Sequence, residues 1–329
     1  MTKLRLTMAC GPYDRMEALY NGDVSIAGVE LAPRIIQRPL DIFSRMLADD
    51  EFDVAVMSLT HCFVLRAARR ARFVALPVFP SRMFRHGFIF VNRRSGIRTP
   101  AELAGRRIGV QGYQMTAAVW IRGHLRSDYG VVLDDVEWFE GGVNQPGVAG
   151  GEATRFRPSR PVKIQSIAKD RTLNDMLTSG EIDALIGADA PRSLQERGAV
   201  IRLFPDYHAV ERAYFERTGI FPIMHALVIR EALYREYPWL ATALYKSCDA
   251  AKAVAHAGAR YTSALRFMLP WLYKHLDEID AVFGADPWPY GLEPNRATLE
   301  AFSRHLADDG FLGQPVPLDE IFVPVDGDR

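Results

Sequence analysis

Apolar residues along the chain follow two different spacings, and the two alternate. Residues 3–10 (KLRLTMAC) alternate between polar and apolar positions, and residues 52–59 (FDVAVMSL) form the continuous apolar run of a buried strand. Between them, the apolar residues of 40–47 recur at helical spacing behind Pro39, a residue favoured in the first turn of a helix. This order of strand, helix and strand predicts a mostly parallel sheet flanked by helices, the α/β class.

The pattern starts afresh in the middle of the chain, which indicates a second lobe. A short strand over 88–92 gives way to polar residues, and residues 107–110 (RIGV) then predict the first strand of a new series. Residues 225–230 predict a strand that returns to the first lobe. We therefore expect a two-lobed α/β protein with a ligand cleft between the lobes. The expected lobes are residues 1–92 with 221–329, including the C-terminal helices, and residues 93–220.

Composition and charge exclude several classes of protein. Lys plus Arg and Asp plus Glu number 40 each, so nothing global indicates binding to nucleic acid or to a membrane. The chain has no run of about 18 apolar residues and no long apolar run before Gly11-Pro12, so we expect neither a membrane span nor a secretory signal. Cys10, Cys62 and Cys248 are widely spaced and form no metal or disulfide motif. We expect a cytoplasmic protein without a metal site, and the sequence leaves a homo-oligomer open.

The balanced net charge hides a basic segment made of arginine alone. Residues 66–107 contain eleven Arg and no Lys, against the single acid Glu102. The planar guanidinium group forms two-pronged contacts with carboxylates, so this segment favours recognition of a small anion. The alternative is that most of these side chains lie on solvated helix faces.

Polar side chains that directly follow the expected strands are candidates for a binding site, because ligands of open α/β sheets bind at the carboxyl ends of strands. A helix that begins after such a strand also presents unpaired N–H groups to an anion. We predict that His86 and His225 are catalytic. The predicted substrate-binding residues are Ser58, His61, Ser81, Arg82, Arg85, Tyr113, Gln114, Thr116 and Asp189.

Each candidate also has a structural explanation. Ser58 and Thr116 are typical helix caps, and Tyr113 and Gln114 suit the packing of a strand–helix corner. A single histidine such as His225 is more often structural than catalytic. The Gly-, Pro- and Arg-rich residues 141–161 predict a long loop, and loops of this length are usually functional or mobile.

Two long segments carry a family resemblance. Residues 77–91 (PVFPSRMFRHGFIFV) and 112–123 (GYQMTAAVWIRG) resemble the 4,5-dihydroxyphthalate decarboxylase family, and the match extends over most of residues 1–260 in consistent order. The resemblance implies a type-2 periplasmic-binding-like fold. It also implies a carboxy-lyase of aromatic compound catabolism and phthalate degradation. The expected reaction is decarboxylation of a hydroxylated aromatic carboxylic acid, 4,5-dihydroxyphthalate, to protocatechuate and CO2 without a cofactor. In that reaction Arg82 and Arg85 suit carboxylate anchoring, and His86, followed by His225, suits proton transfer.

The chain departs from the family pattern at four positions near the expected cleft. Val56, Gly112 and Asn144 stand where the family usually has an acid, and Cys62 stands where an aromatic hydroxyl is common. These departures leave two alternatives open. The chain acts on another hydroxylated aromatic acid, or it is a small-anion binding protein of the same fold without chemistry.

Overall fold

The computed structural model describes residues 3–147, 155–196 and 198–326, and these fall into two compact units. The predicted loop over 141–161 therefore lies partly outside the described residues. None of the described helices is both long enough and apolar enough to cross a membrane. The first unit comprises Met1–Arg82, His225–Ala297 and Pro317–Arg329, and the second comprises Met83–Met224 and Thr298–Val316.

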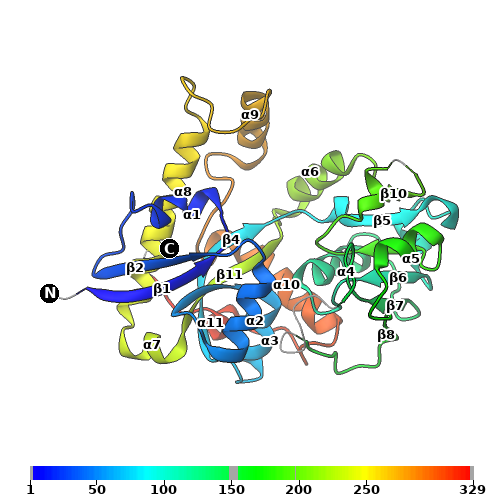
Figure 1. The fold of residues 1–329 in the computed structure, drawn as a ribbon, viewed down its shortest axis with the longest axis horizontal. Coiled ribbons are helices and arrows are strands. Elements are labelled where there is room, and N and C mark those ends of the chain that lie inside the picture. The colour runs from blue at the N-terminus through cyan, green and yellow to red at the C-terminus, as the bar shows by residue number, and fades with distance from the viewer. Residues whose placement is uncertain (1–2, 148–154, 197, 327–329) are drawn as a thin grey trace. The chain divides into compact units, whose positions relative to one another are not determined.

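The first unit is built on a five-stranded sheet in the order β2-β1-β3-β11-β4 (Figure 1). β1 is parallel to β2 and β3, whereas β11 runs antiparallel to β3. β3 is buried at every residue, which explains its unbroken apolar sequence, since the helices α2 and α3 contact it. The strands are β1 (Leu4–Cys10), β2 (Val29–Ile35), β3 (Val54–Ser58), β4 (Phe73–Arg82) and β11 (Ile223–Arg230).

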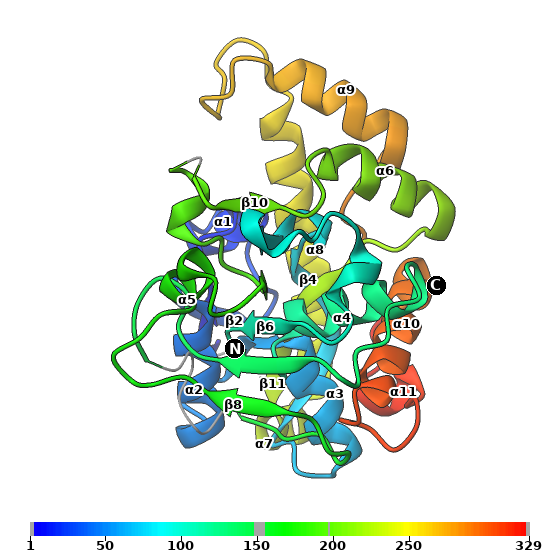
Figure 2. The same cartoon turned by 90° about the vertical axis from the view of Figure 1, so that its right-hand side faces the viewer.

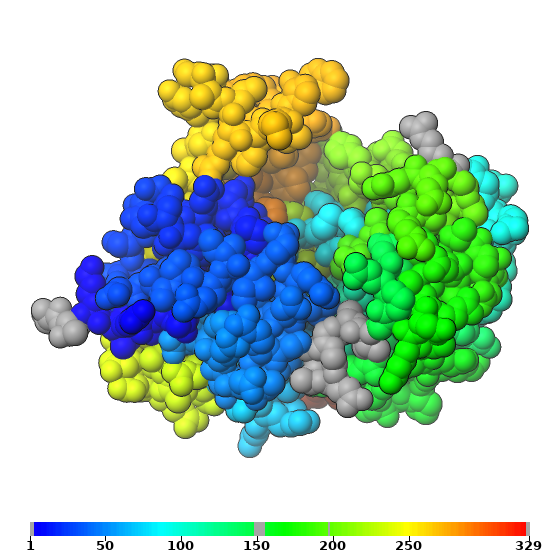
Figure 3. All heavy atoms as spheres, in the orientation of Figure 1, coloured from blue at the N-terminus to red at the C-terminus, as the bar shows by residue number. Residues whose placement is uncertain are grey.

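Local chemistry accounts for the bounds of α2 and for the late start of α9. α2 has Pro39 at its first position and ends at Asp50, which adopts a left-handed backbone conformation. The apolar spacing of 261–275 predicts a helix, but α9 begins only after Pro270, and its segment projects from its unit (Figure 3). The helices are α1 (Asp14–Tyr20), α2 (Pro39–Asp49), α3 (Leu59–Ala67), α7 (Glu231–Glu236), α8 (Trp239–Ala259), α9 (Leu272–Phe283) and α11 (Leu318–Ile321).

The second unit contains a six-stranded sheet in the order β10-β5-β9-β6-β7-β8 (Figure 2). Strand alternation buries both faces: Val91 and Ile186 pack on one side, and Phe90 and Leu185 on the other. The strands are β5 (Ile89–Asn92), β6 (Arg107–Val110), β7 (Glu137–Glu140), β8 (Ile164–Ser166), β9 (Ala184–Ile186) and β10 (Val200–Arg202). The helices are α4 (Thr116–Ser127), α5 (Leu173–Ser179), α6 (Tyr207–Thr218) and α10 (Arg296–Asp308).

The structure divides the chain differently from the expected lobes 1–92 with 221–329, and 93–220. β5 pairs with β9 and β10 of the second sheet, so the first boundary lies between Arg82 and Met83. Thr298–Val316 joins the second unit, because Asp309 forms buried ion pairs with Arg122 and Arg126 of α4. The hydrophobic pattern of α10 predicts an amphipathic helix. This pattern does not indicate which of the two units the helix packs against.

Candidate functional site

Polar side chains of the first unit gather where β1 and β3 end and β11 begins. His225 of β11 lies opposite Ser58 in the antiparallel register, and the Tyr13 hydroxyl lies 3.4 Å from His225 Nδ1. The ring of Phe43 contacts both His225 and His61. These contacts bring three predicted residues together, because parallel strands end at a common edge of the sheet. We call Tyr13, Ser58, His61, Ser81 and His225 the His225 cluster.

Ser58 does not cap the helix that it precedes. It occupies the N-cap position of α3, yet its side chain makes no capping hydrogen bond. It is buried at the end of β3, directly opposite His225.

Tyr13 supplies the His225 cluster with a protonated phenol. Burial raises the pKa of Tyr13 to about 12, with Cys10 adding to the rise and a hydrogen bond with Ser81 opposing it. At neutral pH the hydroxyl therefore keeps its proton. When it donates that proton to Nδ1, the neutral imidazole of His225 carries its own proton on Nε2.

Arg15 places a cation beside Tyr13. Its guanidinium carbon lies 4.5 Å from the centre of the Tyr13 ring and 4.3 Å from that of Trp288, while Nε donates to the Pro80 carbonyl at 2.6 Å. Sequence reasoning missed Tyr13 and Arg15, because it treated the residues after Gly11 only as a turn and a short helix. The signal was present, since both residues follow β1 closely, at the edge of the sheet where Ser58 ends β3.

Arg82 is engaged in packing the first unit. It is 6% exposed, and Nη2 donates to the Pro289 carbonyl at 2.5 Å and to Asn295 Oδ1. Burial lowers the pKa of Arg82 to about 9, partly offset by Tyr290 and Asp286. These contacts hold the segment before α10 against the end of β4.

A second set of polar residues lies at one edge of the second sheet. β6 and β9 are parallel and end together, and the antiparallel β5 begins at that edge, since Ile186 pairs with both Val110 and Ile89. The residues just beyond these strand ends are therefore close in the fold. We call Arg85, Gln111 and Asp189 the Arg85 cluster.

The guanidinium of Arg85 is buried without an ion pair among the described residues. Arg85 is 5% exposed, its Nε contacts Met224 Sδ at 3.3 Å, and its Nη1 has no hydrogen-bond partner in the described part of the chain. Burial lowers the pKa of Arg85 to about 10, against the opposing effect of Asp189 and Glu211. The group stays charged at neutral pH, and its unused donor suits an incoming carboxylate.

The other predicted residues near this edge of the second sheet are Tyr113, Gln114 and Thr116, and their surroundings differ. Tyr113 packs against Trp138 and under the Arg122 guanidinium, and its backbone N–H donates to Glu140 Oε1 at 2.9 Å, so its ring belongs to the core. Gln114 is 7% exposed. Thr116 is the first residue of α4 rather than its cap, because Met115 holds the N-cap position.

His86 lies inside a cluster of rings in the second unit. It stacks on His124 at 4.8 Å and contacts Tyr214, and neither of its ring nitrogens has a hydrogen-bond partner among the described residues. Burial, with His124 adding to the effect, lowers the pKa of His86 to about 3. The imidazole is therefore neutral at physiological pH and surrounded mainly by aromatic side chains.

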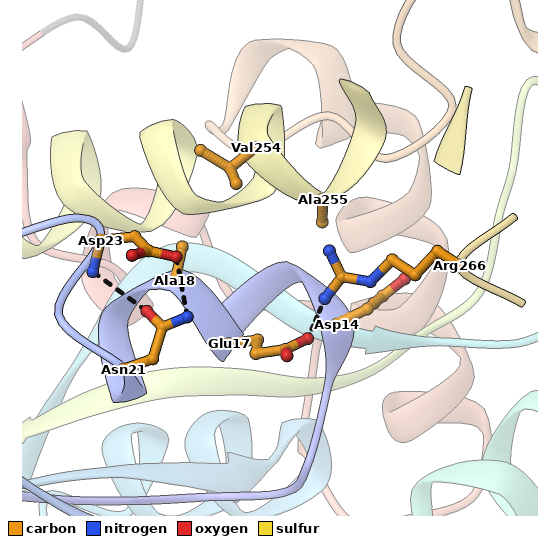
Figure 4. A pocket seen from close by; sticks show the side chains of 8 residues that line it. All are labelled: Asp14, Glu17, Ala18, Asn21, Asp23, Val254, Ala255 and Arg266. Carbon is orange, nitrogen blue, oxygen red and sulfur yellow. Dashed lines mark hydrogen bonds and ion pairs between the residues drawn. The ribbon is translucent and has the colours of Figure 1, made fainter. Parts of the chain in front are cut away.

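A surface pocket of about 320 Å³ lies in the first unit (Figure 4). Its lining includes Asp14, Glu17 and Asp23, with Glu17 paired to Arg266 and Asp23 bonded to Asn21. Three carboxylates against one guanidinium disfavour an anionic ligand. It contains none of the predicted site residues.

Metal-binding chemistry receives no support from the described residues. In the ranges that the structure describes, no group of three or more His, Cys, Asp or Glu side chains is arranged to hold a metal ion. Cys10, Cys62 and Cys248 are buried free thiols, and burial raises the pKa of each.

Solved structures similar to this chain include periplasmic binding proteins. The sulfonate-binding protein SsuA from Methylobacillus flagellatus superposes with a TM-score of 0.55 at 12% identity, covering 98% of this chain and 92% of that one. SsuA from Escherichia coli gives the same TM-score, identity and coverage. This likeness confirms the predicted type-2 periplasmic-binding-like fold.

Curated relatives identify the family. No family model matches the chain. A 4,5-dihydroxyphthalate decarboxylase from Comamonas testosteroni is 37% identical over 326 residues, which cover 98% of both chains. A protein of the same name from Pseudomonas putida is 40% identical over 191 residues, covering 58% of this chain and 73% of that one. The chain therefore belongs to the 4,5-dihydroxyphthalate decarboxylase family.

Proposed function

We propose that the protein is a carboxy-lyase that converts 4,5-dihydroxyphthalate to protocatechuate and CO2. The observation that carries this proposal is the 37% identity with a decarboxylase of that name across 98% of both chains. Polar side chains in each unit support it, because they are of the kinds that such a reaction needs. The substrate is a small aromatic dicarboxylate, and the reaction belongs to phthalate degradation.

The substrate itself assists the loss of CO2. Each carboxylate of 4,5-dihydroxyphthalate lies para to a hydroxyl group, so ionising that hydroxyl pushes negative charge onto the carbon that bears the carboxylate. Protonation of this carbon lets CO2 leave and restores the aromatic ring. A proton replaces CO2, so no electron acceptor is needed. The protein has to supply a proton donor, an acceptor for the hydroxyl, and a cation for the carboxylate that remains.

His225 is the better placed of the two predicted histidines for proton transfer. The Tyr13 hydroxyl at its Nδ1 favours the tautomer with a proton on Nε2, whereas His86 is enclosed by rings in the second unit. The sequence alone ranks His86 first. The contacts favour the reverse order, with His225 as the donor and His86 as a packing residue.

Arg85 is the better placed of the two predicted arginines for anchoring a carboxylate. Arg82 already donates to Pro289 and Asn295, whereas Arg85 has an unused Nη1 donor. A buried guanidinium without a carboxylate partner is costly, and a bound anion removes that cost. Gln114 and Thr116, with the N–H groups at the start of α4, are proposed to orient the same substrate.

Replacing Arg85 by Lys should lower kcat/KM at least tenfold, which corresponds to about 1.4 kcal/mol. Lysine keeps the positive charge but loses the planar, two-pronged geometry. Steady-state kinetics at saturating and limiting substrate measure the effect. Arg82→Lys is expected to lower the melting temperature and to leave kcat/KM near the native value, and the exposed Arg98→Lys is the neutral control. Unchanged kinetics in Arg85→Lys would rule out the anchoring role.

Incubating the purified protein with 4,5-dihydroxyphthalate tests the proposed function. We expect stoichiometric release of CO2 and protocatechuate, measured by gas analysis and chromatography. A protein that binds the compound without releasing CO2 is a binding protein of this fold. A protein that does not react with this compound but decarboxylates another hydroxylated aromatic acid is a family member with a different substrate.

Two further properties remain proposals. A cytoplasmic location is supported by the three buried free thiols, which suit a reducing compartment. Self-association into a homo-oligomer is tested by sedimentation velocity at several protein concentrations.

A further inference from the structure

The orientation of the Gln111 amide is fixed by its neighbour. Gln111 Nε2 donates to Asp189 Oδ2 at 3.1 Å. An ionised carboxylate has no proton to donate, so the group that faces Asp189 has to be the amide NH2 and not its carbonyl. Asp189 therefore determines that the carbonyl oxygen Oε1 points away from it.

The freed carbonyl oxygen is an unused acceptor. Gln111 is 9% exposed, and its Oε1 is buried with no hydrogen-bond donor among the described residues. Leaving such an acceptor unsatisfied costs about 1–3 kcal/mol, and native proteins rarely do so. The atom lies just beyond the carboxyl end of β6, at the edge of the sheet where Arg85 carries its unused donor.

We propose that Gln111, held by Asp189, accepts a hydrogen bond from a hydroxyl group of the substrate and so selects hydroxylated aromatic acids over their dehydroxy analogues. This inference rests on the proposed function and adds a specificity-determining residue to it. An unused donor on Arg85 and an unused acceptor on Gln111 complement the two polar groups of a hydroxylated carboxylate. A site built to bind a hydroxyl rejects an analogue that lacks it, because its own polar atom then stays unpaired.

The test compares the binding of two probes, the proposed product 3,4-dihydroxybenzoate (protocatechuate) and benzoate, by isothermal titration calorimetry. Gln111→Met keeps the length of the side chain and removes both amide groups. We expect it to weaken binding of 3,4-dihydroxybenzoate at least tenfold and to change benzoate binding less than twofold. The exposed Gln165→Met in β8 is the matched control and should change neither.

Asp189→Asn provides a second variant that keeps the shape of the site. An asparagine amide can donate to or accept from Gln111, so the glutamine is free to turn over, and the preference for the hydroxylated probe should fall several-fold. Equal losses for both probes in both variants, or no loss in either, would overturn the proposal. Melting temperatures confirm that the variants are folded. Because binding is measured separately from turnover, this result can be read even when the wild-type protein fails to release CO2, which would refute only the proposed reaction.

Discussion

Replacing His225 by Asn is expected to lower turnover of 4,5-dihydroxyphthalate by about a hundredfold or more, the usual contribution of a general acid or base. Asparagine retains a polar side chain opposite Ser58 but has no group that exchanges a proton near neutral pH. Substrate affinity should change only a few-fold, since anchoring is assigned to Arg85. Single-turnover kinetics and titration calorimetry on the same preparation separate the two effects.

Tyr13→Phe examines the tautomer argument separately. Removing the hydroxyl 3.4 Å from Nδ1 takes away the group that we propose to favour the His225 tautomer with its proton on Nε2. A positioning role predicts a smaller loss of turnover, about tenfold, together with a displaced pH profile of kcat. A purely structural role of Tyr13 predicts a lower melting temperature with an unchanged pH profile.

His86→Asn and the exposed His275→Asn complete the comparison. His86 packs among rings, so its replacement should lower the melting temperature while turnover per folded molecule stays near the native value. His275→Asn should change neither property. A stable, fully active His225→Asn variant, or a hundredfold loss in His86→Asn with native stability, would return the catalytic role to His86.

The sequence was sufficient to predict the fold because its strands have unambiguous patterns. The fully apolar β3 and the alternating β1 both appear within a residue or two of their expected bounds. The unit boundaries depended on long-range pairing instead. β5 joins the second sheet because β9 and β10 are its neighbours, and no local pattern around residues 88–92 contains that information.

The surroundings of the candidate side chains also depend on contacts with residues that are distant in the sequence. Sequence position made Arg82 and Arg85 equivalent, since both lie at the end of β4 or just after it in one basic run. Asn295, more than 200 positions away in the chain, engages Arg82, whereas no described residue forms a comparable hydrogen bond with Nη1 of Arg85. Gln111 is not among the predicted site residues, and its proposed role depends on Asp189, which lies just beyond the end of a neighbouring strand.

The buried ion pair between Arg122 and Asp309 is expected to have the largest effect on stability. Both side chains are fully buried, and Arg122 Nε lies 3.0 Å from Asp309 Oδ2. Burial opposes ionisation of Asp309, but Arg122 and Arg126 outweigh it and hold the pKa of Asp309 below its ordinary value. The pair therefore stabilises the fold at neutral pH, and this contribution is lost as the pH falls through the lowered pKa.

Asp309→Asn should lower the free energy of unfolding by about 3–5 kcal/mol, because it leaves the buried Arg122 charge without its main counter-charge. Urea unfolding measures the change, and the neighbouring exposed Asp308→Asn serves as the control. The double variant Arg122→Met with Asp309→Leu should be more stable than Asp309→Asn, since it removes both charges together. Equal stability of Asp309→Asn and wild type would contradict this account.

Arg122 Nη2 also donates to the Tyr113 carbonyl at 2.8 Å, so loss of the pair should loosen the loop that carries Gln111 and Gln114. The substrate affinity of Asp309→Asn should then fall even at urea concentrations below those that unfold the variant. Such a loss would show that the C-terminal part of the second unit supports the residues proposed to bind substrate.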